Sequence, residues 1–320
     1  MGTRAVRLYV VSDIHASERA WRKMLNAART RMYGADAVLY AGDLTGKAMV
    51  PVVEAGDGYE AELGGRVRRA RTEEELARLE QEIANLGFYA LRTTPEEVER
   101  LRRDPALLEE RFHAEIRGRV ADWMRLAAER MEGSGIPIYL IPGNDDPYEI
   151  DDVLAESPYC VNVDGRVVEI VGGLEVVGAG QSNPTPWRTP REVPDDEFRE
   201  RLAELLGQAR DPRRTILLTH CPPHGSGLDT APLLDAELRP IVSAGDLLRG
   251  PVGSTGVREA IEEFRPLLGL HGHIHESGGE ARVGETLCLN PGSEAAFGIL
   301  RGYLVDVGPD GIERWFRVEG

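Results

Sequence analysis

The chain has 320 residues, 42% hydrophobic and 29% charged residues and a formal net charge of −16, a composition typical of a soluble globular protein. No run of about 18 apolar residues occurs, which excludes a membrane-spanning helix, and the negative charge disfavours polymeric nucleic acid while a small phosphorylated substrate stays compatible. The three cysteines form no CxxC pair and the start lacks a signal-peptide pattern, so we expect reduced thiols in a cytoplasmic protein.

The first half of the chain predicts a βαβ beginning. An apolar run at residues 6–13 favours a strand, residues 17–32 carry apolar side chains at helical spacing, and residues 35–43 indicate a second strand. A third strand is expected at residues 136–145. This alternation is typical of a parallel sheet in an α/β fold.

Residues 46–132 interrupt the alternation. A β segment at 48–63 is followed by two charged helical segments, 72–88 and 94–131, and the second begins with a Thr-Pro-Glu-Glu helix start. We interpret 46–132 as a mainly helical insertion on one edge of the sheet, within a single domain that spans residues 1–320. A solvated face is its simplest role, and a cap over the site or a dimer contact is the alternative.

The second half of the chain predicts further strands and helices from the same periodicities. We expect a hairpin at 165–180, a helix at 195–209, a strand at 214–220, a helix from about 256, a strand at 268–273 and a C-terminal hairpin at 298–320.

Ligand-capable side chains stand where five of the apolar runs end. They are Asp13 and His15, then Asp43, then Asn144 and Asp145, then His220, and finally His271 and His273. In open α/β folds, sites form outside the carboxyl ends of the strands, so we expect these side chains to meet at one edge. Two of the pairs are spaced by two residues, which in an extended segment directs both side chains to the same side.

All of these side chains except Asp145 are candidate metal ligands. Seven ligands are too many for one ion and suit two. Imidazole combined with carboxylate and amide oxygen favours Mn, Fe, Zn, Ni or Co over Ca. Two such ions about 3.5–4 Å apart can clamp a phosphoryl group and activate a water. Asp43, alone at its strand end, is the candidate for a carboxylate that lies between both ions.

The chain resembles the calcineurin-like metallophosphoesterase superfamily in five ordered motifs: D-x-H (Asp13, His15), G-D (Asp43), G-N-x-D (143–146), H (His220) and H-G-H (271–273). The resemblance implies a four-layer α/β/β/α sandwich and two divalent ions, with Mn²⁺ or Fe favoured and Zn, Ni or Co as alternatives. It implies one ion held by Asp13, His15, Asp43 and His273, and a second held by Asp43, Asn144, His220 and His271.

The chain departs from the commonest form of this superfamily at Asp145. Most members have G-N-H-D/E there, and that His contacts the phosphate and can protonate the leaving group, whereas Asp146 fits the acidic position that follows. The chain looks most like a branch of small bacterial and archaeal phosphoesterases that lacks this His. An Asp close to two cations should have a lowered pKa, which prevents general acid catalysis. His224, four residues after His220, is the alternative proton source.

The function that the resemblance implies is phosphoester hydrolysis by in-line attack of a water or hydroxide held by the ions, with Asp13, Asp43, Asn144, Asp145 and His224 as catalytic candidates. Small phosphodiesters are the expected substrates, because a diester with an acidic leaving alcohol needs no general acid. Two alternatives are a catalytically weak metal-binding regulatory protein and a nuclease that acts on polymeric nucleic acid. The resemblance also admits a homodimer.

The other histidines and one cysteine have ordinary interpretations. His275 is expected at the surface or behind the metal ligands, and His113 is expected in solvent. Cys221 follows His220 and is expected to face the opposite side and pack in the core.

Overall fold

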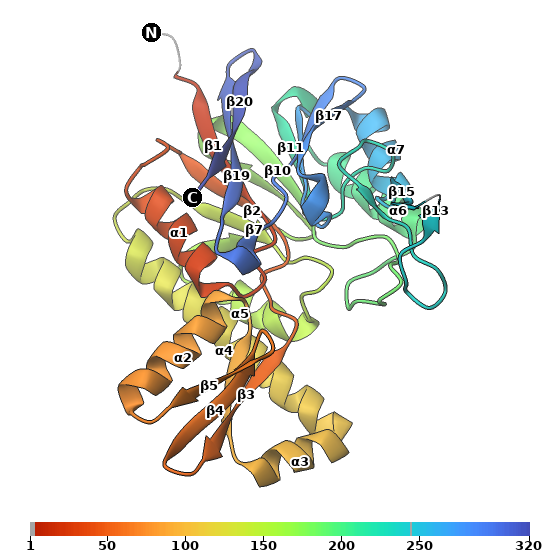
Figure 1. Ribbon diagram of the computed structural model, residues 1–320. Helices are drawn as coiled ribbons and strands as arrows, with labels where there is room; N and C mark the ends of the chain where they lie inside the picture. The colour runs from red at the N-terminus through yellow and green to blue at the C-terminus, as the bar shows by residue number, and fades with distance from the viewer. Residues whose placement is uncertain (1–3, 244) are drawn as a thin grey trace.

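The computed structural model describes residues 4–243 and 245–320 as a mixed α/β fold built around two six-stranded sheets (Figure 1). The first sheet contains β1 (Val6–Val11), β2 (Ala37–Ala41), β7 (Ile138–Ile141), β8 (Cys160–Asn162), β19 (Arg301–Gly308) and β20 (Gly311–Glu319), in the order β20-β19-β1-β2-β7-β8. The second contains β9 (Arg166–Ile170), β10 (Leu174–Ala179), β11 (Thr215–Thr219), β16 (Leu268–Leu270), β17 (Gly279–Val283) and β18 (Thr286–Asn290), in the order β17-β18-β16-β11-β10-β9.

The central strands of both sheets run parallel. In the first sheet β1, β2, β7 and β8 are parallel neighbours, and β19 and β20 add an antiparallel hairpin. In the second sheet β10, β11, β16 and β18 are parallel, while β9 and β17 pair antiparallel at the two edges. The expected parallel sheet and both expected hairpins are therefore confirmed.

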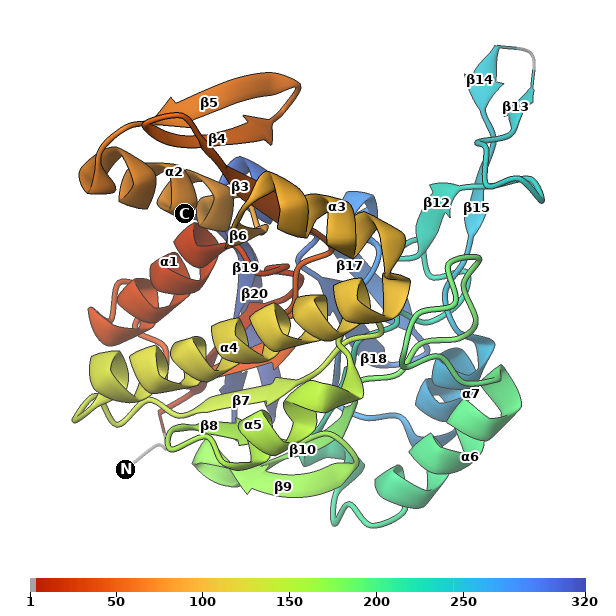
Figure 2. The same cartoon turned by 90° about the horizontal axis from the view of Figure 1, so that it is seen from below.

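Helices cover the outer face of each sheet, and a buried apolar core fills the space between the sheets. Helices α1 (Glu18–Arg29) and α4 (Pro105–Met131) pack on the first sheet, and α6 (Asp195–Leu206) and α7 (Thr255–Phe264) pack on the second (Figures 1 and 2). The helix expected at 195–209 and the helix expected from about 256 are confirmed, since they correspond to α6 and α7.

Helix α1 joins α4 to the first sheet. The side chain of Ser17 caps α1 by accepting a hydrogen bond from the backbone of Ala20. Trp21 of α1 stacks on Trp123 of α4 with ring centroids 4.7 Å apart, and Trp123 Nε1 donates to the Glu18 carboxylate at 2.6 Å. This contact buries the two largest side chains of the core on that face.

A smaller unit follows β2 and projects from the two sheets (Figure 1). It contains β3 (Met49–Ala55), β4 (Gly58–Leu63), β5 (Arg66–Ala70) and β6 (Tyr89–Thr93), in the order β5-β4-β3-β6, with α2 (Glu73–Asn85) and α3 (Pro95–Arg103). It has its own apolar core around Val52, Leu76 and Ile83. The β segment expected at 48–63 is confirmed as β3 and β4.

The helical segment expected at 94–131 is confirmed, and the chain divides it into α3 and α4 with a break at Asp104. Pro105 has no N–H to continue the first helix, and the Asp104 carboxylate accepts a hydrogen bond from Leu107 N at 3.1 Å, which starts the second helix.

If residues 46–132 are an insertion, replacing them with a short loop should leave metal binding intact, and this stays a prediction. The last helix of this segment, α4, supplies six buried side chains to the core on the first sheet: Ile116, Val120, Trp123, Met124, Ala127 and Met131. It also lies between β2 and β7 in sequence, and these strands are parallel neighbours that require a crossover connection. We therefore expect the removable part to end before Pro105.

A second projection is a narrow arm of two short ribbons (Figure 2). Strands β12 (Thr230–Pro232) and β15 (Arg249–Pro251) form its base, and β13 (Val242–Ser243) and β14 (Asp246–Leu247) lie farther out. The sequence did not predict this arm. In the part of the chain that the structure describes, no helix is long and apolar enough to cross a membrane.

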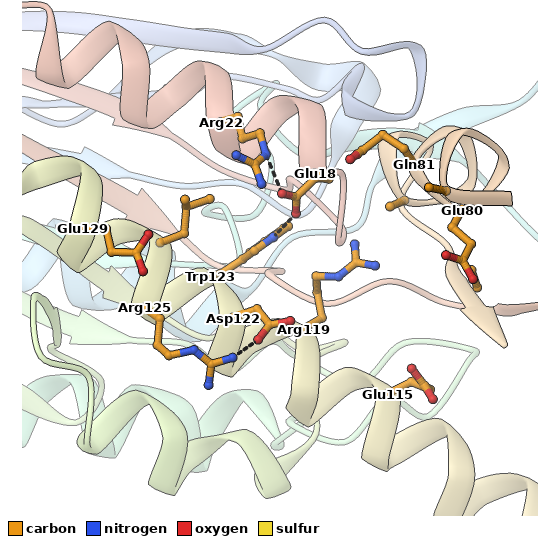
Figure 3. Close-up of a pocket in the computed structure, with 14 residues that line it drawn as sticks. Glu18, Arg22, Glu80, Gln81, Glu115, Arg119, Asp122, Trp123, Arg125 and Glu129 are labelled. Carbon is orange, nitrogen blue, oxygen red and sulfur yellow. Dashed lines mark hydrogen bonds and ion pairs between the residues drawn. The ribbon is translucent and has the colours of Figure 1, made fainter. Parts of the chain in front are cut away.

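A polar groove of about 590 Å³ lies between α1, α2 and α4 (Figure 3). Several of its charged side chains are paired, since Arg22 donates to Glu18 at 2.6 Å and Arg125 pairs with Asp122. The groove therefore resembles a solvated contact between helices.

Candidate metal centre

The loops that follow β1, β2, β7 and β16, together with the end of β11, bring acidic and imidazole side chains together, as the strand-end positions predicted. Three overlapping groups place their ligand atoms within 4.8 Å of one another: Asp13 with His15 and His275, Asp13 with Asp43 and His220, and His15 with Asp43 and Asp145. These groups could hold metal ions.

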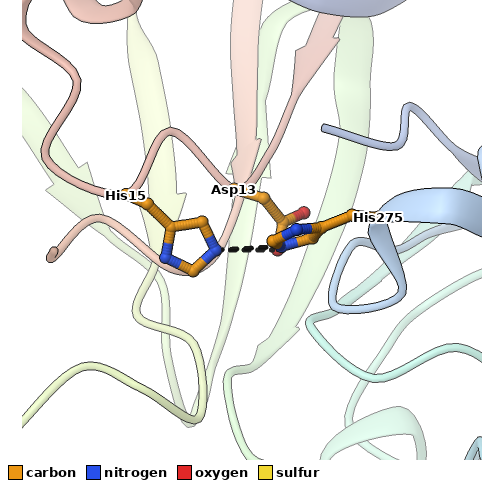
Figure 4. Close-up of side chains that lie close together, drawn as sticks. All are labelled: Asp13, His15 and His275. Atoms are coloured by element: carbon orange, nitrogen blue, oxygen red, sulfur yellow. Dashed lines mark hydrogen bonds and ion pairs between the residues drawn. The ribbon is translucent and has the colours of Figure 1, made fainter. Parts of the chain in front are cut away.

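His275 belongs to this cluster, although we expected it at the surface or behind the ligands. Its Nε2 lies 2.9 Å from His15 Nε2 and 3.4 Å from Asp13 Oδ1 (Figure 4). Its side chain is 37% exposed, so it stands at the boundary between the cluster and solvent. The signal was present in the sequence, because His275 continues the every-second-residue spacing of His271 and His273.

Asp43 occupies the middle of the cluster. Its Oδ2 lies 3.5 Å from His15 Nε2 and 3.3 Å from His220 Nε2. Burial alone would lower the pKa of His220, but the carboxylates of Asp43 and Asp13 outweigh it and raise this pKa to about 10. Burial likewise opposes ionisation of Asp43, yet the neighbouring histidines hold its pKa well below the usual value.

Two ligand atoms in the cluster are buried without a hydrogen-bond partner, namely Asn144 Oδ1 and His220 Nε2. The opposite side of each group is fixed, because Asn144 Nδ2 donates to Thr189 Oγ1 at 2.8 Å and His220 Nδ1 lies 2.8 Å from the Ala41 carbonyl. Asn144 Oδ1 can only accept a hydrogen bond, and a buried acceptor without a partner is unfavourable by about 1–3 kcal/mol. His220 Nε2 carries a proton at neutral pH, because the nearby carboxylates raise the pKa of His220, and it would exchange that proton for a cation. A divalent cation would satisfy both atoms, so these residues fit a metal.

His271 and His273 lie at the same end of the second sheet, outside the three groups that the described residues form. Nδ1 of His271 lies 2.9 Å from Thr219 Oγ1, and its buried Nε2 has no hydrogen-bond partner. The His273 ring lies 5.1 Å from the His220 ring, centroid to centroid. Burial lowers the pKa of both His271 and His273 to about 3, which keeps both rings neutral.

The ligand side chains do not converge from extended segments, as their every-second-residue spacing predicted. Asp13, His15 and His273 are not extended, because β1 ends at Val11 and β16 ends at Leu270. Asp13, His15, Asp43 and His273 instead have left-handed backbone, with φ of 52°, 46°, 58° and 68°. Tight turns, not strand alternation, direct these side chains into the cluster.

The glycines beside the ligands make room for the ligand side chains themselves. A Cβ at Gly42 would lie 2.4 Å from His220 Nδ1, and Gly42 has a φ of 94°. A Cβ at Gly272 would lie 2.4 Å from Asp13 Oδ2. A side chain at either position would therefore displace a candidate ligand.

Asp146 ties two of the loops together. Its buried carboxylate accepts hydrogen bonds from the backbone N–H groups of Leu44 at 3.0 Å, Thr45 at 2.8 Å and Gly143 at 2.8 Å. The loop that carries Asp43 and the turn that carries Asn144 are thus fixed to one carboxylate. From the sequence, Asp146 was assigned only to the acidic position of the motif, and its role in joining the two loops was not predicted.

Asp145 holds a lysine that the sequence reasoning missed. Lys47 Nζ lies 2.6 Å from Asp145 Oδ2, and Asp145 N donates to Asp43 Oδ1 at 3.1 Å. Burial and the charge of Asp43 raise the pKa of Asp145, and Lys47 acts in the opposite sense. We expected a lowered pKa from two nearby cations; the protein groups alone favour a higher one.

A cavity of about 740 Å³ opens beside the cluster and includes Asp43, Asn144, Asp145, Lys47 and His275 in its lining. His224, the expected alternative proton source, is not among the described residues that line this cavity. Its Nδ1 lies 3.2 Å from the Gly253 carbonyl and its side chain is 39% exposed.

Cys221 is buried in the core between the second sheet and its helices, as expected, and Cys160 and Cys288 are also buried free thiols. His113 is partly buried, and its Nδ1 lies 3.1 Å from Glu149 Oε1.

Comparisons with known proteins identify the fold and leave the activity unnamed. No family model matches the chain. A stretch of 162 residues, half of this chain, is 30% identical to the uncharacterized protein MJ1162 of Methanocaldococcus jannaschii. The match covers 66% of that relative, slightly under two thirds of its length.

Two solved structures share the arrangement of elements. The crystal structure of TT1561 of Thermus thermophilus is 16% identical, with a TM-score of 0.51 and 93% of both chains covered. A second crystal structure is 16% identical with a TM-score of 0.56, covering 98% of this chain and 99% of the other. At this level of identity the likeness concerns the fold alone.

Proposed function

We propose that the chain is a dinuclear metal-dependent phosphoesterase of the calcineurin-like type, and that its two sheets and covering helices form the four-layer α/β/β/α sandwich of that superfamily. The observation that carries the proposal is the pair of buried, unpartnered ligand atoms, Asn144 Oδ1 and His220 Nε2, beside the buried carboxylates of Asp13 and Asp43. Such a set of atoms is unfavourable in a protein without a cation to bind.

We assign one ion to Asp13, His15, Asp43 and His273 and the second to Asp43, Asn144, His220 and His271. The central position of Asp43, within 3.5 Å of His15 and 3.3 Å of His220, supports its role as the shared ligand. His275 is a further candidate because of its contact with Asp13. For His271, coordination through Nδ1 would replace its hydrogen bond to Thr219. The donor set favours Mn²⁺ or Fe, and Zn, Ni or Co are alternatives.

Bound divalent ions would polarise the phosphate oxygens and lower the pKa of a water. The protein groups around them position the ester. Thr189 fixes the Asn144 amide, and Lys47 directs a positive charge into the cavity, where a phosphate anion can meet it. We propose that Asp145 holds Lys47 in this position and does not donate a proton. Small phosphodiesters with acidic leaving groups are then the favoured substrates, because they need no general acid.

A panel of phosphomonoesters and phosphodiesters, assayed with Mn²⁺, Fe²⁺ and Zn²⁺ on the purified full chain, tests the proposal. We expect about two ions per chain and hydrolysis of aryl phosphodiesters, with loss of both in Asp43→Ala. His113→Ala is a matched control, because this histidine lies on α4 away from the cluster. A chain that binds both ions and cleaves no ester would favour the regulatory alternative, and cleavage confined to oligonucleotides would favour a nuclease.

A further inference from the structure

The lining of the cavity beside the cluster combines two chemically different sets of residues. The polar set contains Asp43, Lys47, Asn144, Asp145, His273, His275 and Glu276. The other set, which we call the apolar wall, comes from two segments far apart in sequence. Pro186 and Trp187 belong to the loop before α6, and Leu233, Leu234 and Val252 belong to the base of the arm.

The hydroxyl groups on the apolar wall are already engaged. Thr185 and Thr189 both donate to the Glu192 carboxylate, and Thr189 also accepts from the Asn144 amide. Trp187 is 64% exposed, so its indole ring offers apolar surface that a ligand can cover. Among the described lining residues outside the cluster, the other polar side-chain groups are the indole N–H of Trp187 and the Glu276 carboxylate, which lies 3.6 Å from Arg249. Recognition along the apolar wall therefore comes mainly from burial of apolar surface.

We propose that the substrate carries an apolar ester group that lies against Trp187 and Leu233 while its phosphate lies beside Asp43 and Asn144. This inference rests on the proposed phosphoesterase function and names its substrate class: free organic phosphate esters with one alkyl-like group. A volume of about 740 Å³ lies within the usual range of small-molecule sites. A nucleobase can stack on Trp187, but its polar edge would then lie against aliphatic and proline side chains, which offer it no hydrogen-bond partner.

Alkylphosphonates of one, four and six carbons test the inference by calorimetric titration of the Mn²⁺-loaded full chain. These compounds contain a carbon–phosphorus bond in place of the ester bond, so a phosphoesterase cannot hydrolyse them. Binding is therefore measured separately from turnover. Burial of one methylene group in an apolar site improves affinity by about two- to fourfold. We therefore expect affinity to rise along the series by about this factor per methylene group.

Two variants of the wall and one control sharpen the test. Trp187→Ala and Leu233→Ser should flatten the dependence on chain length and leave the affinity for methylphosphonate within about twofold. Phe297→Ala is the control, because Phe297 is 80% exposed and does not line the cavity. It should retain the full dependence. The exposure of Trp187 makes unfolding of that variant unexpected, and thermal melting verifies that both wall variants fold.

Several results would overturn the inference. Equal affinity for methyl- and hexylphosphonate, tighter binding of a nucleoside monophosphate than of hexylphosphonate, or no phosphonate binding would each do so. Co-sedimentation with phosphatidylcholine vesicles that contain phosphatidic acid, abolished by Trp187→Ala, would assign the wall to a lipid surface instead. Hydrolysis of esters without the chain-length dependence would remove only this inference. A chain-length dependence without hydrolysis would support the apolar site and remove the proposed activity.

Discussion

Replacement of Asp146 by Asn should loosen both the fold and the metal centre. The carboxylate uses Oδ2 for the N–H groups of Leu44 and Gly143 and Oδ1 for the N–H of Thr45. An amide of the same shape keeps one acceptor oxygen and turns an NH₂ group toward at least one of these donors. One hydrogen bond to a charged acceptor is therefore lost and two donors face each other.

The magnitude follows from these contacts. A hydrogen bond to a charged group contributes about 1.5–3 kcal/mol, and a buried donor without a partner adds a penalty of similar size. Burial, and then the charge of Asp43, raise the pKa of Asp146, so both disfavour its charged form. The neutral amide of Asn avoids this unfavourable charge and offsets part of the lost stability. We expect Asp146→Asn to lower the free energy of unfolding by about 2–4 kcal/mol.

Urea unfolding followed by circular dichroism measures this change, and metal titration measures its effect on the site. The midpoint should fall with an unchanged slope, and affinity for Mn²⁺ should fall by at least about tenfold, the lower range for loss of a group that orients metal ligands. Asp152→Asn is the matched control, since Asp152 pairs with Arg117 at the surface and outside the cluster, which predicts little change in either measurement. Wild-type stability and metal affinity in Asp146→Asn would refute the view that this carboxylate joins the two loops.

Four further substitutions test three separate features: the shared ligand, the position of Asp145 and the ion pairs of Asp306. Asp43→Ala should remove both ions and Asn144→Ala mainly one, so elemental analysis that finds two ions in purified Asp43→Ala would contradict the shared ligand. Asp145→His should accelerate cleavage of alkyl esters by up to about 10²-fold and leave nitrophenyl esters nearly unchanged; loss of activity toward every ester would instead show that holding Lys47 is essential. Hydrogen bonds from Arg7 and, to a smaller extent, Arg314 hold the pKa of Asp306 below its usual value. This lowered pKa stabilises the fold at pH values above the pKa of Asp306 in the unfolded chain. Asp306→Asn should therefore lower the free energy of unfolding by about 2 kcal/mol at pH 7, and chemical unfolding should show this difference shrinking below about pH 4; a difference that grows in acid would contradict the sign.

The central strands could be predicted because their apolar runs are continuous and end in polar turns. Helix α1 could be predicted because Trp21, Met24, Leu25 and Ala28 repeat at helical spacing, and all four are buried. The arm could not, since its strands have two or three residues and too short a pattern to show a period. Strand β5 could not be predicted either. Most of its side chains are exposed, so apolar and polar residues do not alternate along it.

The candidate site was predictable to the level of its strand ends and no further. Which residues lie at the ends of strands is a local property, so Asp13, Asp43 and His220 were found from single runs. Lys47 and His275 reach the cluster through loops whose course depends on tertiary contacts. Spacing alone also gave no sign that the side chains arrive through left-handed turns.

Those turns give the site a signature that can be read without any assay of activity. Left-handed backbone is unfavourable by about 1–2 kcal/mol for a residue with a Cβ and far less for glycine. In a deep mutational scan scored only for cellular abundance, Gly should therefore be tolerated or enriched at His15 and His273, although it removes both imidazoles. At Asp13 and Asp43 this gain is opposed, because their carboxylates accept hydrogen bonds from the backbone N–H groups of His273 and Asp145. Positions where abundance improves as the side chain disappears would trace the outline of the site, because selection has kept residues there against the preference of the fold.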